Sequence, residues 1–355
     1  MERHMKKTLA LLIAALLIVT SVFVSSCSST DTGTEEKDSG AVKLKAIIVP
    51  KMELGEMSGD FPGEAQLFYE KYCPGTEETR VPHMPESAHF YVNKENGVGI
   101  LVTDSSKTAA SLSLMAILSC EEYDHSEAAI VSVGCAGGSK GYSRPGDVVL
   151  ITAVCDNELG HEADVREMED KNADITWFHD DSYDDFSYKE FDGKTLEKAY
   201  EMTKDCKLRT TEKTDRVMAE NFPGEDWALR RPAVIKGSSV SGDDFWKGEY
   251  GHKNAEFITE YYNCQDPYAV TEMEEISIAN AAACYGILDH VVSFRVIVNM
   301  DVFLKGETPE GLWKETKGYN DKVKKDNSET LDIFEPAMHN LFDTASIVID
   351  AAVKG

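Results

Sequence analysis

The chain has 355 residues and a formal net charge of −27 at pH 7, with 63 acidic side chains against 36 lysines and arginines. Such an acidic surface repels phosphate backbones and anionic lipid headgroups, so the charge argues against a nucleic-acid-binding protein. Beyond an N-terminal leader, the length fits one large α/β domain, because such a domain can reach roughly 250–300 residues before a chain divides.

The first 42 residues have the layout of an export signal followed by a tether. Lys6 and Lys7 precede an apolar run over residues 9–24, and two serines then lead to Cys27. This site resembles the lipobox of bacterial lipoproteins, which implies a signal peptide over 1–26 and a lipid on Cys27. An uncleaved membrane helix is the alternative, but the run is short for a span of roughly 20 apolar residues. Residues 27–42 are expected to form a flexible tether.

The lipid on Cys27 would hold the protein at the cell membrane, on the extracytoplasmic face. No later segment of the sequence is apolar enough to span a bilayer, since charged and polar residues interrupt even the stretch 276–298. We therefore expect the chain to contact the membrane only through the lipid anchor.

The other seven cysteines are scattered singly along the chain and form no Cys-x-x-Cys pair. Their spacing does not support a zinc site or dithiol chemistry. An odd, dispersed set is typical of buried small hydrophobic residues rather than of a disulfide framework. We expect neither a metal nor an organic cofactor.

Apolar, β-branched runs predict six buried strands, at 44–50, 99–103, 128–133, 147–153, 233–241 and 291–298. Helical spacing of apolar residues predicts helices at 106–120, 196–206, 272–286 and 331–353. Apolar strands that alternate with helices indicate a three-layer α/β/α domain over 43–355, with a mainly parallel twisted sheet. The acidic, aromatic-rich stretch 156–191 lacks periodicity and is interpreted as an insertion at the rim of the site.

The unusual residues of the chain follow the predicted strands. Ligands of parallel sheets bind at the carboxyl ends of the strands, so these segments are the candidates for a site. Each segment alone is weak evidence, since a glycine cluster is usually a turn and Ser-Lys at a helix start is usually a cap. The segments are 51–60, 104–110, 134–138, 240–246, 271–274 and the end of the strand at 294–301.

In this order, the segments resemble the nucleoside phosphorylase superfamily, which includes purine nucleoside phosphorylases and methylthioadenosine/adenosylhomocysteine nucleosidases. Within it, segments 55–64, 161–167 and 295–301 resemble the bacterial purine nucleoside permease family. The resemblance implies a nucleoside phosphorylase-like fold and a purine nucleoside as ligand, although the chain has no membrane-spanning pore. The matching residues are Met52-Glu53, Gly134 to Gly138, Gly146-Asp147, Ser241-Gly242-Asp243 with Phe245, and Glu272-Met273-Glu274.

Two departures from the superfamily pattern concern phosphate. Residues 104–107 read Asp-Ser-Ser-Lys where the superfamily has Gly-x-Gly-Lys, and Ser132 stands at the position of a phosphate-binding arginine. Phosphate is a possible co-substrate that Ser105 and Lys107, or Arg144, would hold. The missing arginine favours hydrolysis or simple binding over phosphorolysis.

The substrate-binding set is predicted from residue chemistry within these motifs. Glu274, at a helix start, is suited to accept hydrogen bonds from the ribose hydroxyls, with Met273 packing on the sugar. Phe245 and Trp246 are expected to stack on the base. Ala136 and Gly137 of the glycine cluster complete the predicted set.

Cleavage of an N-glycosidic bond needs a group that hydrogen-bonds or protonates purine N7 while positive charge grows on the sugar. The resemblance assigns this role to an Asp or Asn after the last strand, and Asn299 occupies that position. Asp301, two residues further on, would share its face and supply the acid, or else cap the following turn. In a hydrolase, a glutamate of the first loop activates water, and Glu53 and Glu56 are the candidates.

The sequence thus predicts an extracytoplasmic, purine nucleoside-binding lipoprotein that splits the N-glycosidic bond, releasing base and ribose or ribose-1-phosphate. The alternative is a non-catalytic binding component of nucleoside uptake, and a scaffold that has lost its pocket is a third hypothesis. Superfamily members are often dimers, trimers or hexamers, so a homo-oligomer is a further expectation.

Overall fold

The structure is a computed structural model that describes residues 40–355 except 174, 180–181, 183 and 314–329. The chain divides into two units, Met1–Gly40 and Ala41–Gly355, and every element named below belongs to the second. Cys27 and the predicted signal peptide lie outside the described residues. None of the described helices is both long enough and apolar enough to cross a membrane.

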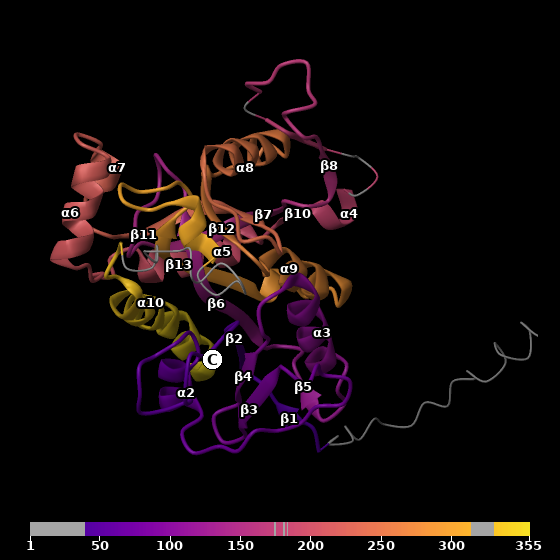
Figure 1. Ribbon diagram of the computed structural model, residues 1–355. Helices are drawn as coiled ribbons and strands as arrows, with labels where there is room; N and C mark the ends of the chain where they lie inside the picture. The colour runs from indigo at the N-terminus through magenta and orange to yellow at the C-terminus, as the bar shows by residue number, and fades with distance from the viewer. Residues whose placement is uncertain (1–39, 174, 180–181, 183, 314–329) are drawn as a thin grey trace, which may run out of the picture. The chain divides into compact units, whose positions relative to one another are not determined.

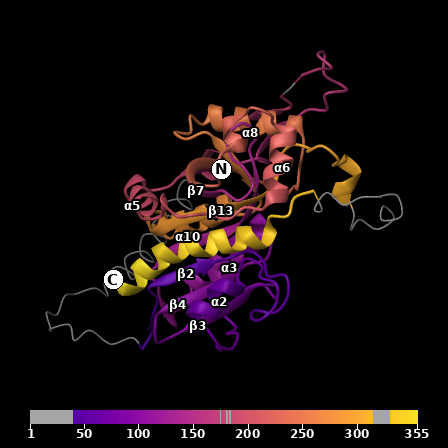
Figure 2. The same cartoon turned by 90° about the vertical axis from the view of Figure 1, so that its left-hand side faces the viewer.

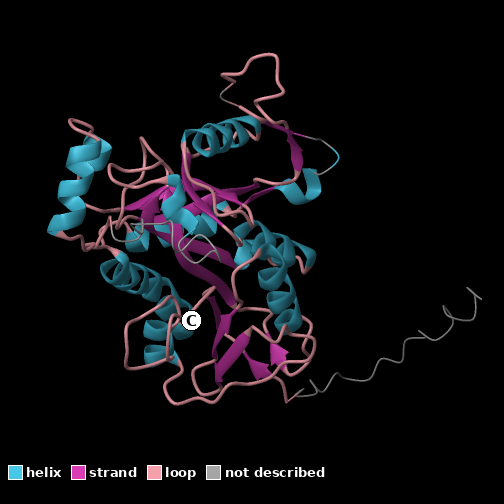
Figure 3. Cartoon of the chain, viewed as in Figure 1, coloured by secondary structure: helices cyan, strands magenta, loops and turns pink. Residues whose placement is uncertain are grey.

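A nine-stranded sheet forms the centre of the domain (Figures 1 and 3). Five of its strand pairings are parallel and four are antiparallel. Eight strands follow the order β10 Tyr188–Glu190, β7 Val148–Asp156, β11 Val234–Ser241, β12 Tyr268–Glu272, β6 Ala129–Gly138, β2 Ala46–Val49, β4 Val98–Val102 and β3 His89–Asn93.

The ninth strand, β13 (Val291–Met300), closes part of the sheet. It pairs in parallel with β6 and antiparallel with β7, so β6, β12, β11, β7 and β13 form a closed ring. The predicted α/β class is confirmed, but the sheet is mixed and barrel-like, and the three-layer arrangement with a mainly parallel sheet is not confirmed. Apolar runs predict that strands are buried, but they do not specify which neighbours pair.

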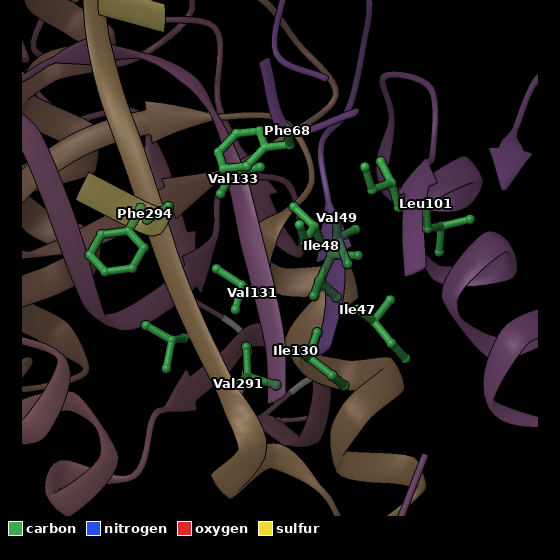
Figure 4. Packing of buried hydrophobic residues seen from close by; sticks show 14 of the residues in the cluster. Ile47, Ile48, Val49, Phe68, Leu101, Ile130, Val131, Val133, Val291 and Phe294 are labelled. Carbon is green, nitrogen blue, oxygen red and sulfur yellow. The ribbon is translucent and has the colours of Figure 1, made fainter. Parts of the chain in front are cut away.

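Buried aliphatic side chains fill the space around β2, β6 and β13 (Figure 4). All four residues of β2 are buried, which explains its uninterrupted apolar sequence. Figure 4 shows Ile48 of β2, Val131 of β6 and Phe294 of β13 on adjacent strands. Because β2, β6 and β13 run in parallel, their carboxyl ends reach the same edge of the sheet.

Helices lie on both sides of these strands. The last helix, α10 (Phe334–Lys354), buries Ala337, Leu341, Ala345 and Ile349, spaced four apart, and contacts β13 and β6. Figures 1 and 2 place α10 on one side of the sheet and α3 on the other. The remaining helices are α2 Gln66–Tyr72, α3 Lys107–Leu118, α4 Asp184–Ser187, α5 Gly193–Thr203, α6 Glu212–Asn221, α7 Asp226–Leu229, α8 Glu249–Tyr261 and α9 Glu275–Cys284, with 3-10 turns at Leu288–His290 and Pro309–Trp313.

The six predicted strands and four predicted helices are confirmed within a few residues. Two boundaries differ: the glycine cluster lies inside β6 rather than after it, and Glu272 ends β12 instead of starting a helix. The stretch 156–191 also contains regular structure, because β10 joins the main sheet and β8 (Gly160–Glu162) pairs with β9 (Trp177–His179). A second small sheet joins β1 (Val42–Lys43) to β5 (Tyr123–Asp124).

Candidate functional site

A cavity of 270 Å³ lies where the carboxyl ends of β6, β12 and β13 meet the loops after β2, β4 and β11. Although β12 is antiparallel to β6, they pair only through Val270–Gly138 and Thr271–Gly137, so their carboxyl ends still meet. The predicted site residues that line this cavity are Ser105, Ala136, Gly137, Phe245, Trp246, Met273, Glu274 and Asn299.

A bulge in β13 presents Asn299 to the cavity. The register between β13 and β6 shifts between Ile297 and Asn299, leaving Val298 as the extra residue. Val298 and Asn299 both line the cavity as a result. A wider groove of 540 Å³ lies near the amino ends of β6 and β13, but none of its polar side chains is buried.

Arg295, Lys51 and three carboxylates form a buried charged cluster below the cavity, which we call the floor. The Arg295 guanidinium is 1 % exposed and lies 2.8 Å from Glu272 Oε2, 3.2 Å from Glu274 Oε2 and 3.2 Å from Glu275 Oε2. Gly134 permits this packing, since a Cβ there would lie 2.8 Å from Arg295 Nη1. Glu272 Oε2 also accepts from the backbone N–H groups of Glu274 and Glu275, so it caps α9.

Lys51 occupies the same floor. Its Nζ donates to Val49 O at 2.7 Å and to Ser132 Oγ at 2.6 Å, and Ser132 Oγ donates in turn to Glu275 Oε2 at 2.6 Å. Ser132, which replaces the expected arginine, is therefore a buried link between a lysine and a glutamate. Both cations that line the cavity, Lys51 and Arg295, already have protein partners.

Burial moves two of these groups toward neutrality at physiological pH. Burial raises the pKa of Glu274 to about 7, although Arg295 opposes the shift. Burial and the nearby Arg295 lower the pKa of Lys51 to about 8. The floor can therefore change its charge near neutral pH, through groups that line the cavity.

Glu64 is a cavity carboxylate that the sequence analysis did not select. It is 3 % exposed; its Oε2 accepts from Lys51 N at 2.9 Å and Met52 N at 3.2 Å. Its Oε1 accepts from the backbone N of Cys135 at 2.7 Å and from Cys135 Sγ at 2.9 Å. The sequence feature that could have identified Glu64 is its place at the end of segment 55–64, which carries part of the family resemblance.

The two glutamates predicted from the same loop do not line the cavity. The carboxylate of Glu53 accepts from the backbone N–H groups of Gly63, Ala65 and Gln66, at 2.6 to 3.0 Å, and so caps the start of α2. Glu56 is exposed on the loop surface. The structure therefore places neither predicted glutamate in the cavity lining, and the path of the loop brings Glu64 there instead.

Asp301 also lies outside the cavity lining, so the structure does not bring it beside Asn299 as an acid. β13 ends at Met300, and alternation of faces does not continue into the bend that follows. The Asp301 carboxylate accepts from Tyr268 OH at 3.0 Å and lies 2.8 Å from His252 Nδ1. Burial works against a charged His252, but Asp301 outweighs it and raises the pKa of His252.

A second charged cluster, at the start of α3, is called the rim and comprises Lys107, Asp156, Glu158 and Asp243. Lys107 Nζ lies 2.9 Å from Asp156 Oδ2 and 2.5 Å from Glu158 Oε2, and it does not line the cavity. Burial opposes the charge, but these carboxylates raise the pKa of Lys107. The backbone N of Lys107 donates to Asp243 Oδ1 at 2.7 Å, so a carboxylate already occupies this helix start.

The turn before α3 keeps a glycine-like backbone without glycine. Asp104 has φ +70° and Ser106 has φ +150°, the two positions at which the superfamily pattern has glycine. Ser106 compensates by capping α3, since its Oγ accepts from Ala109 N at 3.1 Å. Arg144, the other candidate for phosphate, does not line the cavity; it is buried and lies 2.5 Å from Asp215.

The aromatic pair differs in burial. Phe245 is 62 % exposed, whereas Trp246 is half-buried against Gly251 of α8, where a Cβ would lie 2.0 Å from Trp246 Cε3. Asp244 N donates to Glu158 Oε1 at 3.0 Å, which ties the aromatic segment to the rim. Among the described residues, no group of three or more His, Cys, Asp or Glu side chains is arranged to hold a metal ion.

Comparison with known proteins agrees with this architecture. No curated protein matches the chain. The solved structures that resemble it include a mutant MTA/SAH nucleosidase (MTAN) of Helicobacter pylori with 5′-methylthioadenosine in the active site, which is 14 % identical with a TM-score of 0.51. A futalosine hydrolase mutant of Helicobacter pylori gives the same two values, and in both cases 87 % of this chain and 99 % of the other are covered.

The MTA/SAH nucleosidase of Streptococcus pneumoniae, solved with 8-aminoadenine, is 14 % identical with a TM-score of 0.50, covering 87 % of this chain and all of the other. At this level of identity the likeness concerns the fold, which is the phosphorylase-like α/β fold of these nucleosidases. The family model described as "Purine nucleoside permease (NUP)" matches residues 43–355, nearly the whole described domain. The chain belongs to the purine nucleoside permease family.

Proposed function

We propose that this chain binds purine nucleosides in the 270 Å³ cavity and hydrolyses their N-glycosidic bond. One observation carries the proposal: two buried carboxylates from distant segments, Glu64 and Glu274, line one cavity together with Phe245 and Trp246. Paired carboxylates and an aromatic wall are suited to a neutral sugar joined to a planar base.

Glu274 would bind the ribose. Arg295 holds its Oε2, which fixes the carboxylate at the cavity wall. The ionised group would accept hydrogen bonds from two ribose hydroxyls, and charge-assisted hydrogen bonds of this kind are stronger than neutral ones. Met273, beside it in the lining, would pack on the sugar.

Glu64 would orient and activate the attacking water. Its two oxygens accept four hydrogen bonds from Lys51, Met52 and Cys135, so its position is set before a ligand enters. These bonds use all the lone-pair sites of the carboxylate, so the attacking water would replace the thiol of Cys135, the weakest of the donors. A general base that is already held in place avoids the cost of being oriented during the reaction.

Asn299 would bind the base at N7. An amide can donate one hydrogen bond and accept another, which suits 6-oxopurines, but it cannot deliver a proton. We therefore propose inosine and guanosine as better substrates than adenosine, whose departure depends more on protonation of the base.

Phosphate has little place in this proposal. Arg295 is paired with buried carboxylates, and Lys51 donates to the hydroxyl of Ser132. Lys107 is paired with Asp156 and Glu158, and Asp243 accepts from the backbone N–H at the start of α3. A phosphate dianion would enter a cavity in which four carboxylates face two cations, so we propose phosphate-independent cleavage.

The test is base release from inosine, guanosine and adenosine, with and without phosphate, beside a binding titration by calorimetry. We expect release from the 6-oxopurine nucleosides, unchanged by phosphate. Glu64→Gln should abolish release but keep binding, whereas the matched control Glu56→Gln, an exposed glutamate of the same loop, should behave as wild type. Release that requires phosphate would make the protein a phosphorylase and overturn the hydrolytic proposal.

Binding without cleavage is the second candidate. It is favoured by the absence of Asp301 from the cavity lining, which leaves the amide of Asn299 as the group near the base. Tight binding of nucleosides with no release of base would select this alternative, that of an uptake component. If neither binding nor release is found, the nucleoside proposal fails as a whole.

We also propose that a lipid on Cys27 holds the domain at the extracytoplasmic face of the membrane. The sequence around Cys27 supports this proposal. In a bacterial host, Cys27→Ser should abolish incorporation of labelled fatty acid and release the protein from the membrane fraction. Labelling that persists in Cys27→Ser would contradict the assignment.

A further inference from the structure

Two cysteines that are 109 residues apart in the chain lie in contact. Cys155 Sγ and Cys264 Sγ are 3.6 Å apart. Cys155 is the buried penultimate residue of β7, and Cys264 lies, half-buried, between α8 and β12. We propose that Cys155 and Cys264 are a disulfide site of the exported protein, oxidised by an external disulfide.

The surrounding structure holds both cysteines in place. Cys155 pairs with Val240 in the ladder between β7 and β11, and the backbone N of Cys264 donates to Thr259 O at 3.0 Å. The two side chains share one apolar cluster with Val240, Ile258 and Tyr268. A disulfide has an S–S distance of about 2.05 Å, so the two sulfurs must approach by roughly 1.5 Å to form the bond.

The two thiols are unequal, which sets the order of the reaction. Their mutual hydrogen bond lowers the pKa of Cys264 and raises the pKa of Cys155, which is also buried. Cys264 is the more accessible sulfur and the better source of thiolate, so it is the attacking group.

The Cys264 thiolate attacks one sulfur of a disulfide such as oxidised glutathione and displaces the other as a thiolate. Cys155 then loses its proton and attacks Cys264 Sγ in the mixed disulfide, displacing the second thiolate. Two protein thiols are oxidised and one small-molecule disulfide is reduced to two thiols, so atoms and electrons balance. An oxidising extracytoplasmic location would favour this product.

The first experiment maps the bond. The full-length protein is incubated with oxidised glutathione or with dithiothreitol, alkylated, digested with trypsin and analysed by mass spectrometry. Cys155 falls in fragment 141–166, and Cys264 in fragment 254–295, which also contains Cys284. We expect the two fragments to be joined only after oxidation.

Single variants identify the partner of Cys155. The linkage should be lost in Cys264→Ser and retained in Cys284→Ser, the matched control in the same fragment. Fragments that stay separate in oxidised glutathione, or a linkage that survives in Cys264→Ser, would overturn the proposal.

The second experiment measures the Tm of the protein without ligand, so its outcome does not depend on nucleoside binding. Closing a loop of this length restricts the unfolded chain, and we expect the oxidised protein to have a Tm several degrees above the reduced one. The difference should vanish in Cys264→Ser, at a half-buried position, and persist in Cys284→Ser. Equal Tm values for oxidised and reduced wild type, despite a mapped bond, would contradict a native-like disulfide.

Discussion

The floor and the rim of the cavity are both charged, but they differ in burial and in which charged groups remain accessible to a ligand. At the rim, Lys107 faces Asp156 and Glu158 within 2.9 Å, and Asp243 takes the backbone N–H at the start of α3. At the floor, Arg295 is shared among three buried carboxylates, and Glu274 still lines the cavity.

The difference shows that a lysine at a helix start next to a cavity does not by itself make an anion site. The rim supplies its own anions, so an incoming phosphate would have to displace them. The floor carries more carboxylates than cations in a region removed from water, where electrostatic effects are larger. A ligand with hydroxyl donors suits the floor better than an anion does.

The largest expected effect comes from removing the central cation of the floor. Arg295→Met leaves buried carboxylates uncompensated, and loss of one partner of a buried ion pair costs about 3–5 kcal/mol of unfolding free energy. Lys107→Met, at the rim, should cost less, because the side chains of Lys107 and Glu158 are 18 % and 30 % exposed, whereas that of Arg295 is 1 % exposed. Urea unfolding measures both variants, and equal losses would refute the distinction between floor and rim.

The next effect concerns ligand binding by the floor. Glu274→Gln removes the charge that accepts the ribose hydroxyls, and hydrogen bonds to charged groups are worth about 1.5–3 kcal/mol, or roughly 10- to 100-fold in Kd. Calorimetry with inosine measures the change. Glu158→Gln is the rim control and should leave Kd within a few-fold of wild type. A Glu274→Gln protein that binds inosine as tightly as wild type would remove Glu274 from the ribose site.

The raised pKa of Glu274, about 7, predicts a pH dependence of affinity. The ionised carboxylate is the better acceptor, so inosine should bind about tenfold more weakly at pH 6 than at pH 8, following the ionised fraction. The stability of the fold should change with pH in the opposite direction to the affinity. Because the pKa of Glu274 in the folded protein lies above the ordinary 4.5, its contribution to the free energy of unfolding is complete below pH 4.5 and is lost as the pH rises through 7. The affinity profile of Glu274→Gln should be flat between pH 6 and 8, and a slope equal to that of wild type would assign the titration to another group.

The smallest expected effect is at the rim. Asp243→Ala removes the carboxylate at the start of α3, and loss of such a cap costs about 1 kcal/mol. Phosphate should still leave base release unchanged, since Lys107 keeps Asp156 and Glu158 as partners. Phosphate stimulation in Asp243→Ala would instead reveal an anion site that Asp243 blocks in the wild-type protein.

The sequence by itself determined the elements and the segments that converge. An apolar run such as that of β2 predicts a buried strand, and the four-residue spacing in α10 predicts a helix with one buried face. Both patterns follow from the local geometry of the strand and the helix, so the sequence alone contains them. The order of motifs after the strands, through the family resemblance, was enough to predict that Glu274, Phe245, Trp246 and Asn299 share a cavity at the carboxyl ends of the strands.

Only the tertiary structure decided which charged groups reach that cavity. Three glutamates of one loop have no local pattern that tells them apart in the sequence. In the structure Glu53 caps α2, Glu56 is exposed and Glu64 lines the cavity. The path of the loop and the positions of the backbone N–H donors determine these three places. Of the two roles expected for Asp301, the structure does not place it in the cavity lining beside Asn299, because the regular alternation of β13 stops one residue before it. The closure of the sheet by β13 and the contact of Cys155 with Cys264 join residues far apart in the chain, so no local pattern could reveal them.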